Sequence, residues 1–168
     1  MDNQPHWRNL SDPGSRLLRV ELWDVQALAM ALMREHGVAG EWHLGWDHAR
    51  RRAGMCRFQT RTITLSRHLM ELYEPHLVRE VVLHEIAHAL VGPAHNHDAV
   101  WRAKAREIGS SGRRALPADS PRPPAPWLGR CPRGHEYQRY RRPQVQGSCS
   151  RCSARFDPRF LVEWHYRG

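Results

Sequence analysis

Hydrophobic side chains recur at two different spacings along this chain, and these spacings predict helices and strands in turn. In residues 24–37 the apolar positions lie three and four residues apart, which predicts an amphipathic helix that Asp24 could cap. Residues 42–46 alternate between apolar and polar side chains, as is typical of a half-buried strand. Two further strands are predicted over residues 54–58 and 61–66.

The longest mostly apolar segment, residues 75–91, predicts a buried helix. A proline opens the segment and Gly92–Pro93 follows it, which suits the first turn and the end of a helix. After a short loop, a second helix is predicted to begin near His97 or Asp98 and to end before Gly109. The pattern therefore predicts two consecutive helices joined by a short connection.

Two histidines and a glutamate lie inside the apolar helix, in the sequence His84-Glu85-Ile86-Ala87-His88. A helix advances 100° per residue, so His84 and His88 share one face, where two imidazoles can hold one zinc ion beside Glu85. In such sites the metal lowers the pKa of a bound water while the carboxylate takes its proton, which produces hydroxide for peptide-bond hydrolysis. The alternative is that the histidines are only hydrogen-bonded in the core, but burying them without a partner would be costly.

A catalytic zinc ion normally takes three protein ligands, so a further ligand is needed downstream of the motif. Four residues are candidates by position: His95, His97, Asp98 and Glu107. His97 is favoured because a ligand that opens a short helix is held by the packing of that helix, here through Trp101. His95 lies in a freer loop. Sequence geometry alone leaves the choice open.

Two short patterns near the C-terminal end are typical of a second metal site. Cys131 and His135 lie four residues apart, and after a gap of thirteen residues Cys149 and Cys152 form a Cys-x-x-Cys pair. Four such ligands suit a closed tetrahedral zinc site, without which so small a ribbon would not fold. The alternative is a three-ligand or oxidised arrangement with His135 as a bystander. The remaining cysteine, Cys56, is predicted to be a small buried apolar residue.

The basic charge of the chain is concentrated in the same C-terminal segment. The formal net charge is +9, and residues 121–168 carry ten arginines against three acidic residues. Arginines interleaved with aromatic side chains are expected where phosphates and exposed bases are bound together. The alternative is that the aromatic residues form the core of the ribbon and the arginines keep it soluble. We expect DNA contacts from five arginines: Arg139, Arg141, Arg142, Arg151 and Arg155.

The chain is long enough for one domain of ordinary size and a small satellite. Five prolines with serine, glycine and arginine mark residues 110–126 as a linker. The predicted parts are a flexible leader (1–15), a catalytic domain (16–109), this Pro-rich linker and a basic zinc ribbon (127–168). No signal peptide is visible and the longest apolar run is too short to span a bilayer, so we expect a cytoplasmic, monomeric protein without membrane contact.

The motif and its surroundings resemble the SprT-like, or Spartan-type, zinc metallopeptidases. The resemblance rests on the sequence from His84 to Leu90, on His95-Asn96-His97 with Trp101 four residues later, and on the strand patterns 56–58 and 63–66. It implies an α+β, zincin-like domain with helices, a small three-stranded antiparallel sheet and the HExxH helix, followed by a C-terminal zinc ribbon. Asp98 departs from the family, which often has glycine there.

The resemblance also implies roles for individual residues. It makes His84, His88 and His97 the ligands of a catalytic zinc and Glu85 the general base, while His135 replaces the usual cysteine of the ribbon. It implies a zinc-dependent endopeptidase acting on DNA-associated proteins, including DNA–protein crosslinks. The rival hypothesis is a non-catalytic zinc protein that binds nucleic acid or has a regulatory role. We also expect an extended substrate to add to an edge of the strand through Ile63.

Overall fold

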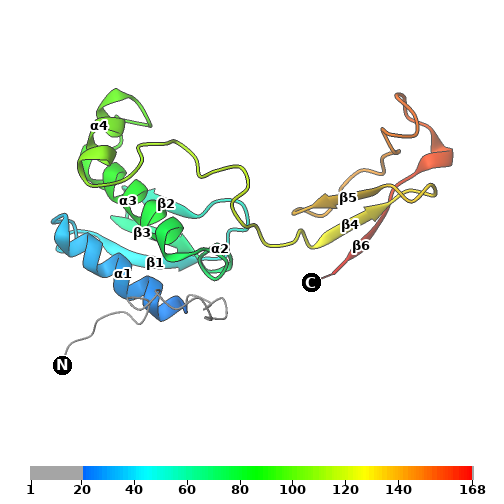
Figure 1. Cartoon of the computed structure of the whole chain (residues 1–168). Helices are drawn as coiled ribbons and strands as arrows, with labels where there is room; N and C mark the ends of the chain where they lie inside the picture. The colour runs from blue at the N-terminus through cyan, green and yellow to red at the C-terminus, as the bar shows by residue number, and fades with distance from the viewer. Residues whose placement is uncertain (1–20, 168) are drawn as a thin grey trace, which may run out of the picture. The chain divides into compact units, whose positions relative to one another are not determined.

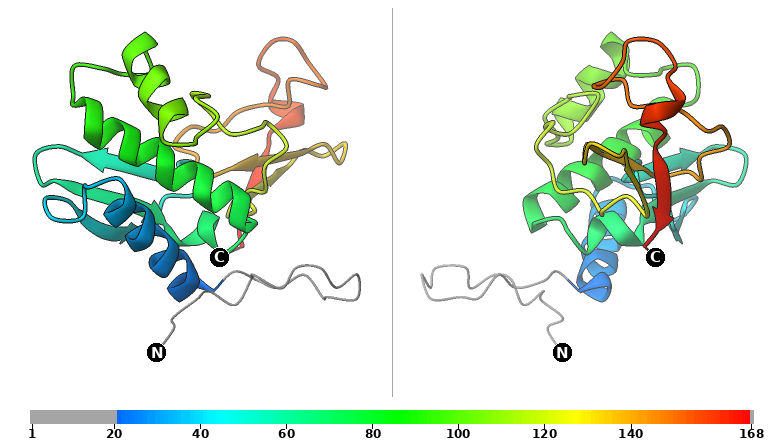
Figure 2. Two further views of the ribbon diagram at one scale, coloured as in Figure 1. Left: turned by 60° about the vertical axis from the view of Figure 1, so that its left-hand side comes forward. Right: turned by 90° about the vertical axis from the view of Figure 1, so that its right-hand side faces the viewer.

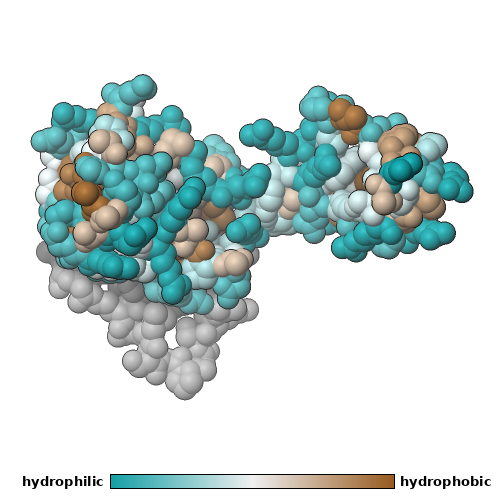
Figure 3. Space-filling model, turned by 90° about the horizontal axis from the view of Figure 1, so that it is seen from above, coloured by the Kyte–Doolittle hydropathy of each residue, from teal (hydrophilic) through white to brown (hydrophobic). Residues whose placement is uncertain are grey.

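The structure is a computed structural model that describes residues 21–167, so the predicted leader (1–15) lies outside the described residues. The chain divides into two compact units that meet between Pro123 and Pro124, inside the predicted linker. Each unit is described by itself. In the described part of the chain, no helix combines the length and the apolar character needed to cross a membrane. The visible surface is mostly hydrophilic, with hydrophobic side chains in small separate areas (Figure 3).

The described part of the first unit, residues 21–123, contains four helices and one three-stranded sheet (Figure 1). Each predicted element is present, with small shifts at its ends. In chain order the elements are α1 (Leu22–Glu35), β1 (His43–Asp47), β2 (Gly54–Arg57), β3 (Thr62–Ser66), α2 (Arg67–Met70), α3 (Pro75–Val91) and α4 (Ala99–Glu107). Asp24 does not cap α1, because the helix begins after Glu21 and Asp24 is buried in its first turn.

The sheet is mixed, and the prediction of an antiparallel sheet was wrong. Its strand order is β1-β3-β2, with β3 parallel to β1 and antiparallel to β2. The chain reverses direction once after β1 and once after β2, so the first and third strands run the same way. The central place of β3 also overturns the expectation that the strand through Ile63 has a free edge. The outer strands of this sheet are β1 and β2.

The core of this unit lies between α3 and the sheet, where α3 packs against β2 and β3 with α1 and α4 also in contact with it (Figure 2). Ile63 and Leu65 on β3 are completely buried there, as the alternation predicts. Pro75 opens α3 and Gly92, at a φ of 82°, ends it. The motif helix is therefore anchored on three sides.

The second unit is a small antiparallel sheet with the order β5-β4-β6. Its strands are β4 (Trp127–Arg130), β5 (Glu136–Arg139) and β6 (Glu163–Tyr166), and a 3-10 turn, η2 (Pro158–Phe160), precedes the last strand. The core consists of Cys131, Cys149 and Val162, with partly buried side chains around them. A Cβ at Gly129 would lie 2.8 Å from the Trp164 ring, so only glycine lets this ring pack on β4.

Candidate active site

Three imidazoles converge on one point at the surface of α3. His84 and His88 come from this helix, and His97 comes from the residue before the cap of α4. The Nε2 atom of His97 lies 3.0 Å from Nε2 of His84 and 3.1 Å from Nε2 of His88. The structure therefore brings together the three histidines that the family resemblance predicted as ligands, although they are up to thirteen residues apart in sequence.

A buried tryptophan supports the three rings. The ring of Trp101, which is completely buried, lies 4.6 Å from those of His84 and His97 and 5.1 Å from that of His88. Asp98 caps α4 by accepting a hydrogen bond of 3.0 Å from the Trp101 N–H. His97 itself has a φ of 57°, a conformation that non-glycine residues seldom adopt outside functional sites. Helix capping and ring packing thus fix the third imidazole.

Backbone carbonyls orient the two helical imidazoles. His84 makes a hydrogen bond to the backbone of Arg113, and His88 makes one to the backbone of His95. Because Nε2 of each ring faces the other histidines, the donor to each carbonyl is Nδ1. A proton on Nδ1 leaves the Nε2 lone pair free for a metal ion.

The electrostatics favour the neutral form of each imidazole. Burial and the neighbouring imidazoles lower the pKa of His84 to about 4. Burial and the charge of His97 also lower the pKa of His88 to about 4. Burial also lowers the pKa of His97, and the nearby positive charge of Arg114 adds to this effect. Three neutral nitrogen donors facing one point fit a zinc ion, whose tetrahedral bonds would separate them by about 3.4 Å.

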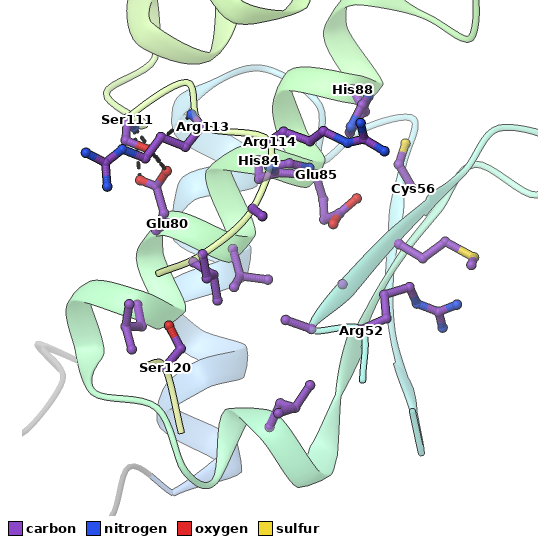
Figure 4. Close-up of a pocket in the computed structure, with 18 of the residues that line it drawn as sticks. Arg52, Cys56, Glu80, His84, Glu85, His88, Ser111, Arg113, Arg114 and Ser120 are labelled. Carbon is purple, nitrogen blue, oxygen red and sulfur yellow. Dashed lines mark hydrogen bonds between the residues drawn. The ribbon is translucent and has the colours of Figure 1, made fainter. Parts of the chain in front are cut away.

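Glu85 lies between the histidines and the edge strand β2 (Figure 4). Its side chain is only 7 % exposed and accepts a hydrogen bond from the backbone N–H of Cys56. Burial raises the pKa of Glu85 to about 8, while the charge of Arg52 and the Cys56 hydrogen bond act in the opposite direction. A Cβ at Gly54 would lie 2.7 Å from Oε1 of Glu85, so glycine leaves room for the carboxylate.

The other candidate ligands lie outside this group. The Nδ1 atom of His95 lies 2.8 Å from Oδ2 of Asp98, whose other oxygen caps α4. Glu107 is exposed and accepts a hydrogen bond of 2.7 Å from Lys104. In the described part of the chain, the group that could hold a metal here contains only the three histidines.

A segment that follows α4, residues 109–122, lies along α3 and is called the strap below. Glu80 on α3 accepts hydrogen bonds from the hydroxyl of Ser110, at 2.9 Å, and from the N–H of Ser111, at 3.1 Å. Beyond this anchor the strap carries the Arg113 carbonyl that holds His84. The proline-rich composition of residues 110–126 predicts a linker, but the structure holds the start of this segment against α3. The available signal was that Glu80 precedes His84 by four residues and so shares its helix face.

The four predicted ligands of the second unit also converge. Nδ1 of His135 lies 3.6 Å from Sγ of Cys131, 3.4 Å from Sγ of Cys149 and 3.3 Å from Sγ of Cys152, and all four cysteines of the chain are free of disulfides. Zinc–sulfur bonds of about 2.3 Å require similar separations, so the donor set fits a closed tetrahedral zinc site. Cys56 lies apart from this group, half-buried in β2, and burial raises the pKa of its thiol to about 12.

One face of the ribbon sheet combines arginine and aromatic side chains. The Arg139 guanidinium lies 5.0 Å from the Trp164 ring centre, and that of Arg142 lies 6.0 Å from the Trp127 ring centre. Tyr166 packs against Trp127 at 5.2 Å. These three rings are absent from the predicted nucleic-acid contacts, although the alternation of Trp164 and Tyr166 along β6 was a usable signal.

The five arginines predicted to contact DNA are all exposed. In residues 21–167, none of them has a carboxylate oxygen within 4.0 Å. Among the aromatic residues that alternate with these arginines in the sequence, Tyr137 and Phe160 pack against the ribbon core. These two rings therefore form part of the ribbon core, as the alternative interpretation predicted. The five arginines remain available to a partner.

An HExxH helix, a third histidine held by a neighbouring helix and a buried carboxylate define the site of a zinc metallopeptidase. The model of the SprT-like family matches residues 27–121, more than half of the chain, and the chain belongs to this family. A search of curated proteins gave no match. A search of solved structures found the metallopeptidase zymogen jannalysin of Methanocaldococcus jannaschii, with 15% identity and a TM-score of 0.46 over 52% of this chain and 83% of that chain.

The close approach of Gly54 and Glu85 generates a first prediction. Gly54→Ala places a methyl group where the carboxylate lies, so Glu85 must move away from the histidines. We expect kcat for peptide cleavage to fall about 10²-fold, the cost of a displacement of roughly 1 Å, while zinc content is unchanged. Gly40→Ala is the matched control, because nothing lies within 4 Å of that position. Full activity of the Gly54 variant would show that Glu85 has no fixed position.

The anchor of the strap generates a second prediction. Glu80→Ala removes the hydrogen bonds from Ser110 and Ser111 and so loosens the carbonyl that holds His84. We expect zinc affinity, measured by competition with a chromogenic chelator, to fall about 10–100-fold. Glu107→Ala is the control, since this glutamate is exposed and lies outside the histidine group. Equal affinities of the two variants would contradict the role given to the strap.

Proposed function

We propose that this protein is a zinc-dependent endopeptidase that acts on DNA-associated proteins, including DNA–protein crosslinks. The proposal includes two zinc ions, a catalytic one held by His84, His88 and His97 and a structural one held by the four ligands of the ribbon. The observation that carries it is the convergence of three Nε2 atoms next to a buried carboxylate. A site that served only to hold the fold together would have no use for Glu85.

The residues around the cleft would divide the reaction between them. The three imidazoles hold the zinc ion, which when bound lowers the pKa of water and polarises a carbonyl group. Glu85 accepts the proton of the attacking water and donates it to the nitrogen that leaves when the peptide bond breaks. The Cys56 N–H and the space at Gly54 keep this carboxylate in place. The Arg113 and His95 carbonyls keep the ligand imidazoles oriented.

The edge strand β2 offers a way to bind an extended substrate. The Ser66 N–H donates to the Ala53 carbonyl, so by the alternation of an antiparallel pair the polar backbone groups of Gly54 and Cys56 point away from β3. The Cys56 N–H is held by Glu85, which leaves the Gly54 N–H and the two carbonyls for a peptide. A peptide that adds to this edge would pass Glu85, since both residues lie against that side chain. This edge takes the place of the one predicted on the strand through Ile63.

The ribbon supports the proposed link to DNA. Its exposed arginines provide charge for phosphates, and the rings of Trp127 and Trp164 beside Arg139 and Arg142 provide surfaces on which bases can stack. The chain that joins the ribbon to the catalytic unit would raise the local concentration of the peptidase near a protein attached to the same DNA. Such tethering selects substrates without requiring a narrow cleft.

A third prediction separates a peptidase from a non-catalytic zinc protein. Glu85→Gln should abolish cleavage of an unfolded protein substrate, at least 10²-fold, because the amide cannot accept a proton, while the zinc content stays at its wild-type value. His97→Ala should lose the zinc of the catalytic unit, and His95→Ala, the control, should keep it. If Glu85→Gln cleaves as fast as the wild type, the general-base assignment is wrong. If the wild-type protein with bound zinc cleaves nothing, the rival hypothesis holds.

A fourth prediction concerns DNA. Arg139→Gln and Arg142→Gln together should weaken binding of single-stranded DNA. They should also reduce the magnitude of the slope of log K against log salt concentration by about 1.4, because each phosphate contact contributes roughly 0.7 to this slope for single strands. Fluorescence anisotropy over a series of salt concentrations measures both quantities. Arg130→Gln is the control, since Arg130 is paired with Glu136 on the same sheet. Binding that is absent, or that does not depend on salt, would exclude the proposal.

A further inference from the structure

The cavity that contains His84 and Glu85 has a pronounced excess of positive charge. It has a volume of about 970 Å³, and its lining includes seven arginines but only two glutamates. Both glutamates are already engaged, because Glu80 anchors the strap and Glu85 accepts from Cys56. A cleft lined by one sign of charge concentrates its field and attracts groups of the opposite sign.

Four of these seven arginines come from two segments that form two walls of this cavity. Arg50 and Arg51 come from the connection between β1 and β2, and Arg113 and Arg114 come from the strap. In Figure 4 the Arg114 side chain extends from the strap over the cavity in the direction of His88, and its charge also acts on His97. His84, His88 and Glu85 lie on α3, the helix between these walls. A bound peptide would therefore meet arginine on both sides.

These four arginines have no acidic partner within residues 21–167. No carboxylate oxygen of that part of the chain lies within 4.0 Å of their side chains. Their neighbour Arg52 differs, because its guanidinium pairs with Asp47 at 2.5 Å. The fold thus neutralises one arginine of the β1–β2 connection and leaves the others available. Guanidinium groups bind carboxylates through two parallel hydrogen bonds, which gives direction as well as attraction.

The lining favours a peptide over a nucleic acid as the partner of these arginines. Single strands are bound by exposed aromatic rings in addition to charge. Apart from the histidines, the aromatic rings of the described lining are Phe58 and Tyr73, and both are taken up by the core: Phe58 packs edge-on against Trp42, and Tyr73 is 5 % exposed. On the ribbon face, by contrast, the rings of Trp127 and Trp164 lie directly beside arginine side chains.

We infer that the cleft selects peptide segments with acidic side chains next to the scissile bond, with Arg114 contacting them on one wall and Arg51 on the other. This inference rests on the proposed function, because it takes the cleft as the place where a peptide is cut. It names the substrate class that the catalytic unit prefers, separately from any targeting by the ribbon.

Three peptides of one sequence, with Glu, Gln or Lys on both sides of the scissile bond, test the inference. Wild-type protein should cleave the Glu peptide with a kcat/KM roughly fivefold to tenfold above that of the Gln peptide, the sum of a few exposed ion pairs, and the Lys peptide should be slowest. The preference should shrink as salt is added. Arg114→Gln should lower the Glu-to-Gln ratio about twofold to threefold, and Arg114→Gln combined with Arg51→Gln should bring the ratio close to one. Arg34→Gln, an exposed arginine outside the cavity, is the control and should keep the wild-type ratio.

A binding measurement separates failure of this inference from failure of the proposed function. The Glu85→Gln protein with bound zinc should bind the Glu peptide more tightly than the Lys peptide, by fluorescence anisotropy, whether or not the wild type cleaves them. If the wild type cleaves none of the peptides, the peptidase proposal is overturned, and the ratio of the binding affinities still decides the charge preference. Equal binding and equal cleavage of the three peptides would overturn the inference. So would an Arg114→Gln variant that loses affinity for single-stranded DNA but keeps the peptide ratio.

Discussion

The structure depends on the need to satisfy both ring nitrogens of His84 and His88 on α3. These imidazoles are half-buried, and an unpaired nitrogen away from water is costly, so each ring needs a partner at Nδ1 and another at Nε2. For His84 and His88 the inner partners are backbone carbonyls of Arg113 and His95, which lie in segments that follow the helix. The outer nitrogens then face His97 and one common point. A metal ion held at that point would make this arrangement of three lone pairs favourable.

Several features of the unit follow from this requirement. Asp98 caps α4 and Trp101 packs beneath the rings, so the loop between the two helices has little freedom. The strap has to lie along α3, because its carbonyl is needed at His84, and Glu80 holds it there. The catalytic unit therefore extends beyond the last helix, in agreement with the family match to residue 121 and the division after Pro123.

Charge is used differently in the two units. In the ribbon, Arg139 and Arg142 lie over tryptophan rings, an arrangement suited to phosphate and base together. In the catalytic cavity, the arginines of the strap and of the β1–β2 connection surround a histidine–glutamate centre whose aromatic neighbours belong to the core. Because the groups beside each guanidinium determine what can bind there, we propose a different class of ligand for each unit.

The sequence by itself determined the elements and the chemistry that depends on near neighbours. The helical period predicted the position of α3 and the shared face of His84 and His88. The short spacing of Cys149 and Cys152 predicted that both belong to one group of metal ligands. Both signals act over a few residues. Tertiary structure decided that His97 rather than Glu107 joins the group, that β3 is the central strand, and that Gly54 makes room for Glu85. The linker composition of residues 110–126 also concealed the strap, whose position depends on a hydrogen bond to a helix thirty residues earlier. Such contacts join segments that no local period relates, so only the folded chain reveals them.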